Sequence, residues 1–187
     1  MSYNLISDQV IIIIVTKYAA FLRGINVGGR IIKMADLKAC LEKAGLNDVR
    51  TLLQSGNVVF ESGKDRAVLK SLIEAALSGA FGYPAKVQVM PVEDLSKVVD
   101  KYPFGTAADD QHDYVIFMEN GLEDELAAEP CRLAPGEQVA AGLGVVYWRV
   151  AKGSTLKSDF AKLLAKSKYR QFNTNRNIRT LRKMLAL

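Results

Sequence analysis

The sequence predicts an α+β protein made of two ferredoxin-like (split βαβ) halves with mainly antiparallel sheets. Two observations predict this fold class. Apolar patterns typical of strands and helices follow one another in the order βαββαβ over residues 18–90, which is the order of the split βαβ motif. The order strand, helix, hairpin, helix over residues 114–166 then repeats most of this pattern, although no sequence repeat is visible. At 187 residues, the chain has room for one ordinary domain or two small ones.

The elements of the first half follow from apolar spacing and from turn residues. They are strands over 18–22, 49–53, 58–61 and 86–90, and helices over 34–44 and 68–77. Leu37 and Leu41 lie on one helical face that ends at Gly45, and Ser62 with Asp65 forms a capping-box pattern before the second helix. If the connection between the first two strands is right-handed, these strands run parallel and end at the same edge of the sheet.

The second half begins at Pro91, a residue that suits a helix N-terminus. The expected elements are helices at 92–99, 122–128, 160–164 and 178–185, a strand over 114–118, and a hairpin of 138–141 with 145–150. Ser158 is a residue type that caps helices. We therefore divide the chain into an N-terminal extension (1–15), a first α+β unit (16–90), and a second unit with a basic C-terminal helical segment (91–187).

The N-terminal residues contain an apolar run from Val10 to Val15, far shorter than the roughly 20 residues that cross a bilayer. No basic segment or small-residue cleavage site accompanies this run, so we expect no secretory signal, no membrane partner and a cytoplasmic location. One hypothesis treats residues 1–14 as an upstream extension, with Val15 encoded by an alternative start codon. The alternative is that residues 10–22 form one long buried strand.

The composition excludes several kinds of chemistry. His112 is the only histidine, which excludes any site that needs two imidazoles. Cys40 falls on an apolar helical stripe and Cys131 in an expected loop, and two cysteines are too few for a disulfide framework. Paired carboxylates such as Glu93 and Asp94 lie in loops or first helical turns, where acids stabilise the helix. We expect no metal site and no cofactor.

The residues that point to a function lie in two polar, glycine-containing loops, each of which follows an expected strand. The loops are Arg23-Gly24-Ile25-Asn26-Val27-Gly28-Gly29 and Gln54-Ser55-Gly56-Asn57. Glycine permits positive φ values and lets a ligand approach the backbone amides closely. Because the two preceding strands are expected to end at one edge of the sheet, the polar residues of both loops should lie close together around the opening of one binding site. These residues are Arg23, Asn26, Gln54, Ser55 and Asn57.

Neither loop is a standard nucleotide-binding or catalytic motif. A Walker loop requires a lysine and a hydroxyl residue after its second glycine, and these are absent from Gly24-x-x-x-Gly28-Gly29-Arg30-Ile31. The G-x-G-x-x-G pattern is absent as well. Ser55 lacks both a G-x-S-x-G elbow and a neighbouring histidine, so we expect no covalent catalysis. The first loop is therefore either an anion-binding loop before a helix or a structural turn.

The C-terminal segment is strongly basic. After Asp159 the chain contains no acid, and its last 28 residues carry +8 although the whole chain carries only +5. The bases are Lys162, Lys166, Lys168, Arg170, Arg176, Arg179, Arg182 and Lys183. This asymmetry favours an anionic partner, and the alternative is a solvated helix face. Tyr169 and Phe172, which alternate with some of these bases, either stack on nucleic-acid bases or pack on the core.

Several motifs resemble a widespread bacterial family of unknown function. They are Ala20 to Gly29, Met34-Ala35-Asp36-Leu37, and Thr51 to Phe60, in this order. The resemblance covers residues 16–187 and implies two ferredoxin-like α+β units, but it implies no activity. The later signature of that family is Lys-Ser before a helix and Arg-Asn-aromatic-Asn-Thr near the end. Its matches are Lys157, Ser158, Arg176, Asn177 and Thr180, whereas Ile178 and Arg179 replace the usual tryptophan and asparagine.

The leading hypothesis is a protein that binds an anion, either a phosphate-bearing small molecule or nucleic acid. The expected ligand-binding residues are Arg23, Asn26, Gly28, Gly29, Gln54, Ser55, Gly56, Asn57, Lys157, Ser158, Arg176, Asn177 and Thr180. A second hypothesis is a small metal-independent enzyme in which arginine and backbone amides stabilise developing negative charge. A third is a protein-interaction module that uses an exposed sheet. The sequence leaves these three hypotheses open.

Overall fold

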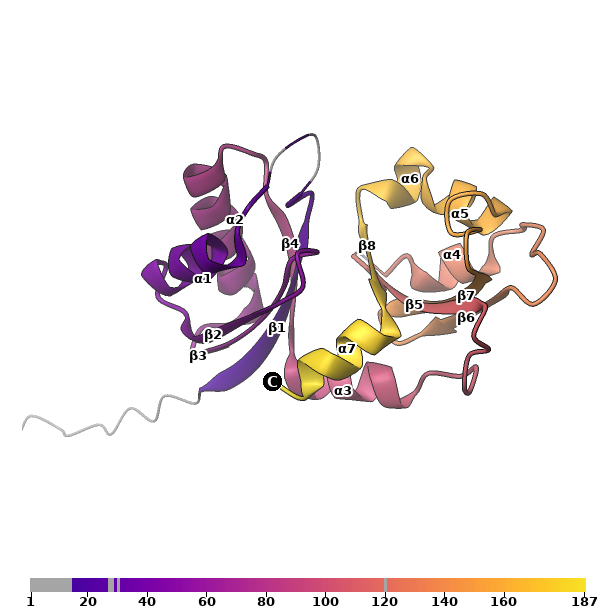
Figure 1. Ribbon diagram of the computed structural model, residues 1–187, viewed down its shortest axis with the longest axis horizontal. Coiled ribbons are helices and arrows are strands. Elements are labelled where there is room, and N and C mark those ends of the chain that lie inside the picture. The colour runs from indigo at the N-terminus through magenta and orange to yellow at the C-terminus, as the bar shows by residue number, and fades with distance from the viewer. Residues whose placement is uncertain (1–14, 27–28, 30, 120) are drawn as a thin grey trace, which may run out of the picture.

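A computed structural model describes residues 15–26, 29, 31–119 and 121–187. Two four-stranded antiparallel sheets form its frame, with the strand orders β2-β3-β1-β4 and β6-β7-β5-β8 (Figure 1). Both orders are those of a split βαβ unit, so the predicted α+β class with two ferredoxin-like halves is confirmed. The extension proposed for residues 1–14 lies outside the described residues.

The first half consists of one sheet and two helices. Its elements are β1 (Thr16–Arg23), α1 (Met34–Lys43), β2 (Asn47–Leu52), β3 (Asn57–Ser62), α2 (Arg66–Phe81) and β4 (Lys86–Pro91). β3 pairs antiparallel with both β1 and β2, so β1 and β2 run in the same direction, as the right-handed connection predicts. α1 and α2 cover the outer face of the sheet, where Leu37 and Ile73 pack in a core with Phe60 (Figure 1).

The second half repeats this arrangement. Its elements are β5 (Gln111–Met118), α4 (Glu123–Ala128), β6 (Gln138–Gly142), β7 (Val145–Ala151), α5 (Asp159–Leu164), α6 (Ser167–Arg170) and β8 (Asn173–Asn177). The helices cover the outer face of the sheet and bury Trp148, Phe160 and Tyr169. The Tyr169 hydroxyl lies within hydrogen-bond distance of two carboxylates, 2.9 Å from Glu125 and 2.8 Å from Glu129, and can donate its one proton to either. Tyr169 therefore packs in the core, which was one of its two expected roles.

Three local features differ from the sequence-based expectation. One is the short helix α6, which was not among the predicted elements. The edge strand β8 was not predicted, because its sequence, Asn173-Thr174-Asn175-Arg176-Asn177, has no apolar alternation. It pairs with β5 through backbone groups, which any side chain permits. The capping-box expectation is also wrong in part. Asp65 alone caps α2 by accepting a hydrogen bond from the Val68 N–H, whereas Ser62 belongs to β3.

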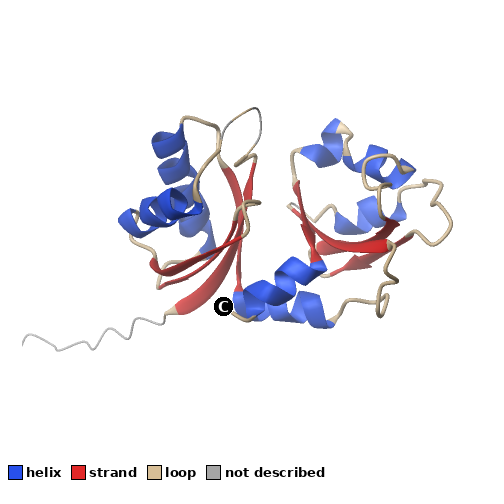
Figure 2. Cartoon of the chain, viewed as in Figure 1, coloured by secondary structure: helices blue, strands red, loops and turns tan. Residues whose placement is uncertain are grey.

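The inner faces of the two sheets pack against each other. Phe21 of β1 stacks on Phe117 of β5 with their ring centroids 4.5 Å apart. The helix that links the halves, α3 (Val92–Asp100), and the last helix, α7 (Ile178–Leu185), pack against each other and add Leu95 and Leu181 to the same core. The layers are therefore helices, sheet, sheet and helices (Figure 2). We call the contact between the two halves the junction, and α3 and α7 lie at one end of it. The halves share a core, and we expect them to unfold together.

Leu181→Ala is expected to destabilise the protein by about 2–5 kcal/mol, because the substitution leaves a cavity in the shared core. The control is Lys183→Ala, at an exposed position of the same helix, which should change the free energy of unfolding by less than about 0.5 kcal/mol. Urea denaturation followed by circular dichroism measures both. Separate transitions for the two halves, or equal effects of the two substitutions, would contradict a shared core.

Candidate functional site

The two glycine loops meet beside the C-terminal end of β1. Asn26 joins them, because its side-chain nitrogen donates to the carbonyl oxygen of Gln54 at 2.5 Å. The side-chain oxygen of Asn26 accepts a hydrogen bond from the Ile32 N–H at 3.0 Å. The Leu22 N–H donates to the Gly56 carbonyl at 2.8 Å. The predicted neighbourhood of the two loops is therefore confirmed.

Gly56 lies at the tightest point of the second loop. Its φ is +75°, and a Cβ atom built there would lie 2.8 Å from the Leu22 Cβ and 3.1 Å from the Ile25 Cγ2. A side chain is therefore disfavoured both by the backbone conformation and by the space available. Because glycine stands here, the loop packs directly against the end of β1.

Asn57 is fully buried and fixes the shape of this turn. Its side-chain nitrogen donates to the Leu52 carbonyl and to the Ser55 hydroxyl, both at 2.9 Å. Its side-chain oxygen accepts a hydrogen bond from the Nε of Arg176 at 2.7 Å. Asn57 thus connects the turn of the first half with an arginine of the second.

Arg176 extends from β8 into the turn. Its Nη2 donates to the carbonyl oxygens of Leu22 at 2.7 Å and Ser55 at 3.3 Å, and its Nη1 donates to that of Asn175 at 2.8 Å. The guanidinium carbon lies 5.5 Å from the ring centroid of Phe21. Nη2 also lies 3.5 Å from the Gly56 carbonyl oxygen, so the guanidinium contacts four backbone oxygens and an aromatic face in addition to Asn57.

The charge of Arg176 is buried beside neutral groups. Every oxygen that it contacts among the described residues belongs to a carbonyl or an amide. Burial and the positive charge of nearby Arg23 lower its pKa to about 10. The group is still protonated at neutral pH, so the protein holds a desolvated positive charge without a carboxylate partner in the described part of the chain.

Arg23 crosses the junction in the opposite direction. From the end of β1, its two terminal nitrogens donate to the carbonyl oxygens of Gln171 at 2.5 Å and Arg170 at 2.6 Å. Burial lowers the pKa of Arg23, and the negative charge of Glu119 partly opposes this shift. Glu119 is itself paired with Lys70 at 2.9 Å. Two arginines therefore tie the halves together through backbone carbonyl groups.

A cavity of about 420 Å³ lies where these groups meet. It is lined by Leu22, Arg23, Gly24, Ile25, Asn26, Gln54, Ser55, Arg170, Asn173, Thr174, Asn175 and Arg176. Three of these residues are arginines and none is acidic, so the cavity has a positive potential. Its volume lies in the range of pockets that hold small molecules.

The remaining predicted site residues lie away from this cavity or outside the described part. Gly28 lies outside the described residues, and Gly29 is exposed with a φ of +82°. Lys157 and Ser158 border a different cavity, at the start of α5. Ser158 caps α5, as predicted, by accepting a hydrogen bond from the Ala161 N–H.

The end of β8 and the start of α7 hold the last two predicted residues. Asn177 caps α7 by accepting a hydrogen bond from the Arg179 N–H at 2.9 Å. Thr180 is half-buried within α7. Neither residue lines the arginine cavity, which the structure builds instead from Arg176 and its neighbours in β8.

Asn173, Thr174 and Asn175 were not predicted as site residues, and Arg170 was predicted only as one of the C-terminal bases. All four line the cavity through β8 or the segment before it. One signal in the sequence could have revealed them. The second half repeats strand, helix, hairpin and helix, and completing the split βαβ pattern requires one more strand after the last of these helices.

The basic C-terminal segment does not present its charges on one element. Lys162, Lys166 and Lys168 form ion pairs with Asp159, Glu129 and Glu125, respectively. The arginines are divided between α6, β8 and α7. The charge available to a ligand is therefore concentrated around the arginine cavity and along α7.

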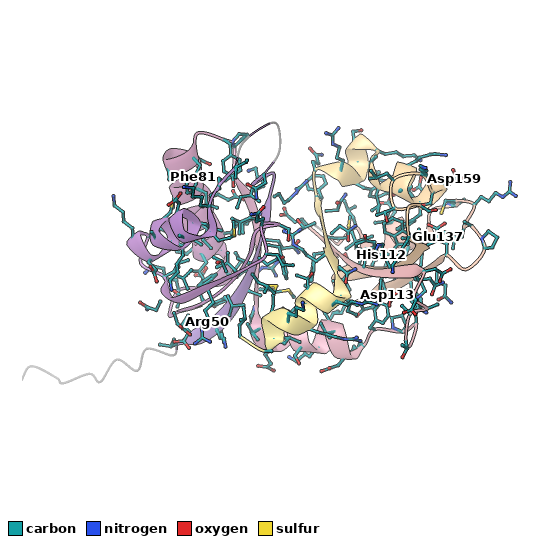
Figure 3. The ribbon with its side chains drawn as sticks, viewed as in Figure 1. Arg50, Phe81, His112, Asp113, Glu137 and Asp159 are labelled. Carbon is teal, nitrogen blue, oxygen red and sulfur yellow. The ribbon has the colours of Figure 1, made fainter. Side chains whose placement is uncertain are left out.

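Other titratable groups lie elsewhere in the second half. His112 belongs to β5 and is half-buried beside Tyr114 (Figure 3). The adjacent Asp113 accepts a hydrogen bond from the Arg149 Nε at 2.7 Å. The described residues contain no group of three or more His, Cys, Asp or Glu that could hold a metal ion. No described helix is long and apolar enough to span a membrane.

Gly56→Ala should destabilise the protein by about 1–3 kcal/mol more than Gly153→Ala. Both glycines have positive φ, +75° and +81°, but a Cβ at Gly153 would meet nothing within 4 Å. The difference between the two variants therefore isolates the close contact with Leu22. Thermal and urea unfolding measure it, and equal losses would show that the backbone conformation alone requires glycine at position 56.

Arg176→Lys should lower the free energy of unfolding by about 2–4 kcal/mol, because a lysine cannot replace the planar set of donors to Leu22, Ser55 and Asn57. Arg179→Lys, at an exposed position three residues later, is the matched control and should be nearly neutral. Urea unfolding measures both free energies. Equal stability of the two variants would contradict a structural role for the Arg176 guanidinium.

Comparison with known proteins places the chain in a family. Residues 15–147 match the model of a protein family of unknown function, DUF1697. Among solved structures, conserved bacterial protein SP0830 from Streptococcus pneumoniae is 28% identical with a TM-score of 0.75, over 92% of this chain and 98% of that one. An unknown protein from Galdieria sulphuraria is 13% identical with a TM-score of 0.25, over 87% and 97% of the two chains. No curated protein matches the sequence. The chain belongs to the DUF1697 family.

Proposed function

We propose that this protein binds a phosphate-bearing small molecule in the arginine cavity between its two halves. The observation that carries the proposal is the buried charge of Arg176, which has no carboxylate partner among the described residues and a pKa lowered to about 10. A bound anion would supply the missing counter-charge. Hydrogen bonds and ion contacts between a guanidinium and a phosphate are among the strongest polar interactions in proteins.

Other features of the cavity also suit a phosphate. Arg23 and Arg170 add two positive charges to its lining. Gly24 lines the cavity with a φ of +65°, and no atom lies within 4 Å of where its Cβ would be. The absence of a side chain at this position leaves more space in the cavity for a ligand. The positive charges of the cavity lining and the space beside Gly24 together favour a compact anion with several acceptor oxygens.

A small molecule is favoured over nucleic acid by the geometry of the positive charges. The cavity is of small-molecule size, at about 420 Å³. Three of the four lysines of the basic segment, Lys162, Lys166 and Lys168, form ion pairs, so fewer free charges lie along an open surface for a polymer to contact. A polymer would also bind with a steep dependence on salt concentration, which a thermal-shift screen at two salt concentrations detects.

Inorganic pyrophosphate, nucleotides or sugar phosphates are expected to raise the melting temperature of the protein. At one hundred times its dissociation constant, a ligand adds about 2.7 kcal/mol to the free energy of unfolding. Titration calorimetry then gives the affinity of the best ligand for the unmodified protein and for three variants, Arg23→Gln, Arg23→Lys and the control Arg132→Gln. Arg23→Gln should weaken binding at least tenfold because it removes a positive charge from the cavity, and Arg23→Lys should restore part of the loss.

The matched control is Arg132→Gln, which removes an exposed arginine that borders the different cavity near α5. Its affinity should equal that of the unmodified protein. If no small phosphate compound binds, or if Arg23→Gln and Arg132→Gln bind equally well, the proposed site is wrong. Stabilisation by oligonucleotides alone would support a nucleic-acid partner instead.

A further inference from the structure

A second cavity, of about 410 Å³, lies between the two halves and shares no lining residue with the arginine cavity. β4, α3, β5 and β7 form its walls, and the first residues of α2 and α4 also line it. None of its residues was singled out as a candidate binding residue in the sequence. Its lining combines an apolar wall with several polar groups that lack partners.

The wall of this cavity is mainly apolar. Met90, Phe117, Val145 and Tyr147 come from the inner faces of the two sheets. Leu143 lines the cavity from the turn between β6 and β7 and is 81% exposed. A ligand that covered these groups would remove apolar surface from water, so the body of the ligand should be apolar.

Two oxygen atoms of the lining residues are buried without a hydrogen-bond partner. Gln88 is only 5% exposed, and its Oε1 has no partner among the described residues. The same holds for the Oε2 of Glu123. Buried polar atoms are nearly always paired, so two unpaired acceptors in the lining of one cavity need an explanation. A ligand that carries a nitrogen donor would provide the missing partner.

Two cations of the lining residues are also unpaired. Arg66 and Lys101 form no ion pair within the described residues, whereas Lys97 is paired with Glu93 at 2.9 Å and Asp94 at 3.0 Å. The cavity thus offers unpaired acceptors and unpaired cations together. A purely cationic or purely anionic ligand would satisfy only one of these sets, and a zwitterion would satisfy both.

We propose that this cavity binds a small zwitterion with an apolar side chain, which is the chemistry of a free apolar amino acid. Its ammonium group faces the two unpaired oxygens, its carboxylate faces the two unpaired cations, and its side chain lies against the apolar wall. The proposal does not depend on the anion proposed for the arginine cavity, because the two cavities have no residue in common.

The methionines provide a direct test. Met90 and Met118 line the cavity, whereas Met34 packs on the core of the first half. In protein labelled with ¹³C at the methionine methyl groups, L-phenylalanine at up to about 10 mM should shift the signals of Met90 and Met118 saturably and leave that of Met34 unchanged. Absence of a saturable shift would overturn the proposal.

Two analogues of phenylalanine test the recognition of each charge. Phenethylamine lacks the carboxylate and phenylpropionate lacks the amine, so each should bind at least tenfold more weakly than phenylalanine. If phenylpropionate binds as tightly as phenylalanine, the role given to the unpaired oxygens is wrong. If phenethylamine binds as tightly, the role given to Arg66 and Lys101 is wrong.

Gln88→Leu separates a binding role from a structural one. The substitution removes the buried, unpaired Oε1 and puts an apolar side chain of similar size in its place, so the melting temperature of the free protein should stay the same or rise. Phenylalanine binding should fall at least tenfold. Gln138→Leu, at an exposed position of β6, should keep the affinity for phenylalanine unchanged. Unchanged binding in Gln88→Leu would overturn the proposal.

Discussion

The junction between the two halves depends on one buried guanidinium. Arg176 extends from the edge strand of the second sheet and binds the Leu22 carbonyl, where β1 nears its end, and the side chain of Asn57, where β3 begins. Burying a charge is costly, and the hydrogen bonds to neutral oxygens offset part of that cost. Gly56 allows the turn to approach β1 closely enough for these bonds to form. The hydrogen bonds of Arg176 therefore connect three elements, which are the end of β1, the turn before β3 and the edge strand β8.

The same interaction sets the chemistry of the cavity beside it. A guanidinium that binds carboxylates contributes little net charge, but one that binds carbonyl oxygens keeps its positive potential. Arg149 shows the contrast, because it is buried but is neutralised by Asp113. Arg176 and Arg23 are both tied to carbonyl groups across the junction, so the contacts that hold the halves together also make the arginine cavity electropositive.

The sequence predicted the fold well because apolar periodicity determines most of it. The shared direction of β1 and β2 correctly placed Asn26 next to Gln54. The strand β8 was missed because edge pairing uses backbone groups and leaves no apolar alternation. The partners of Arg176 could not be predicted either, since carbonyl oxygens are present at every residue and leave no pattern. Lys157 was grouped with the glycine loops by family motif, but it borders a different cavity.

The most direct test of this account is nitrogen-15 NMR of the arginine Nε–H groups during a titration with inorganic pyrophosphate. The Nε–H of Arg176, bonded to Asn57 at 2.7 Å, should exchange slowly with solvent and shift saturably as pyrophosphate binds. The Nε–H of Arg149, bonded to Asp113 at 2.7 Å, should also exchange slowly but should not shift. Rapid exchange at Arg176, or a signal that pyrophosphate leaves unchanged, would contradict a buried charge that both holds the junction and faces an anion site.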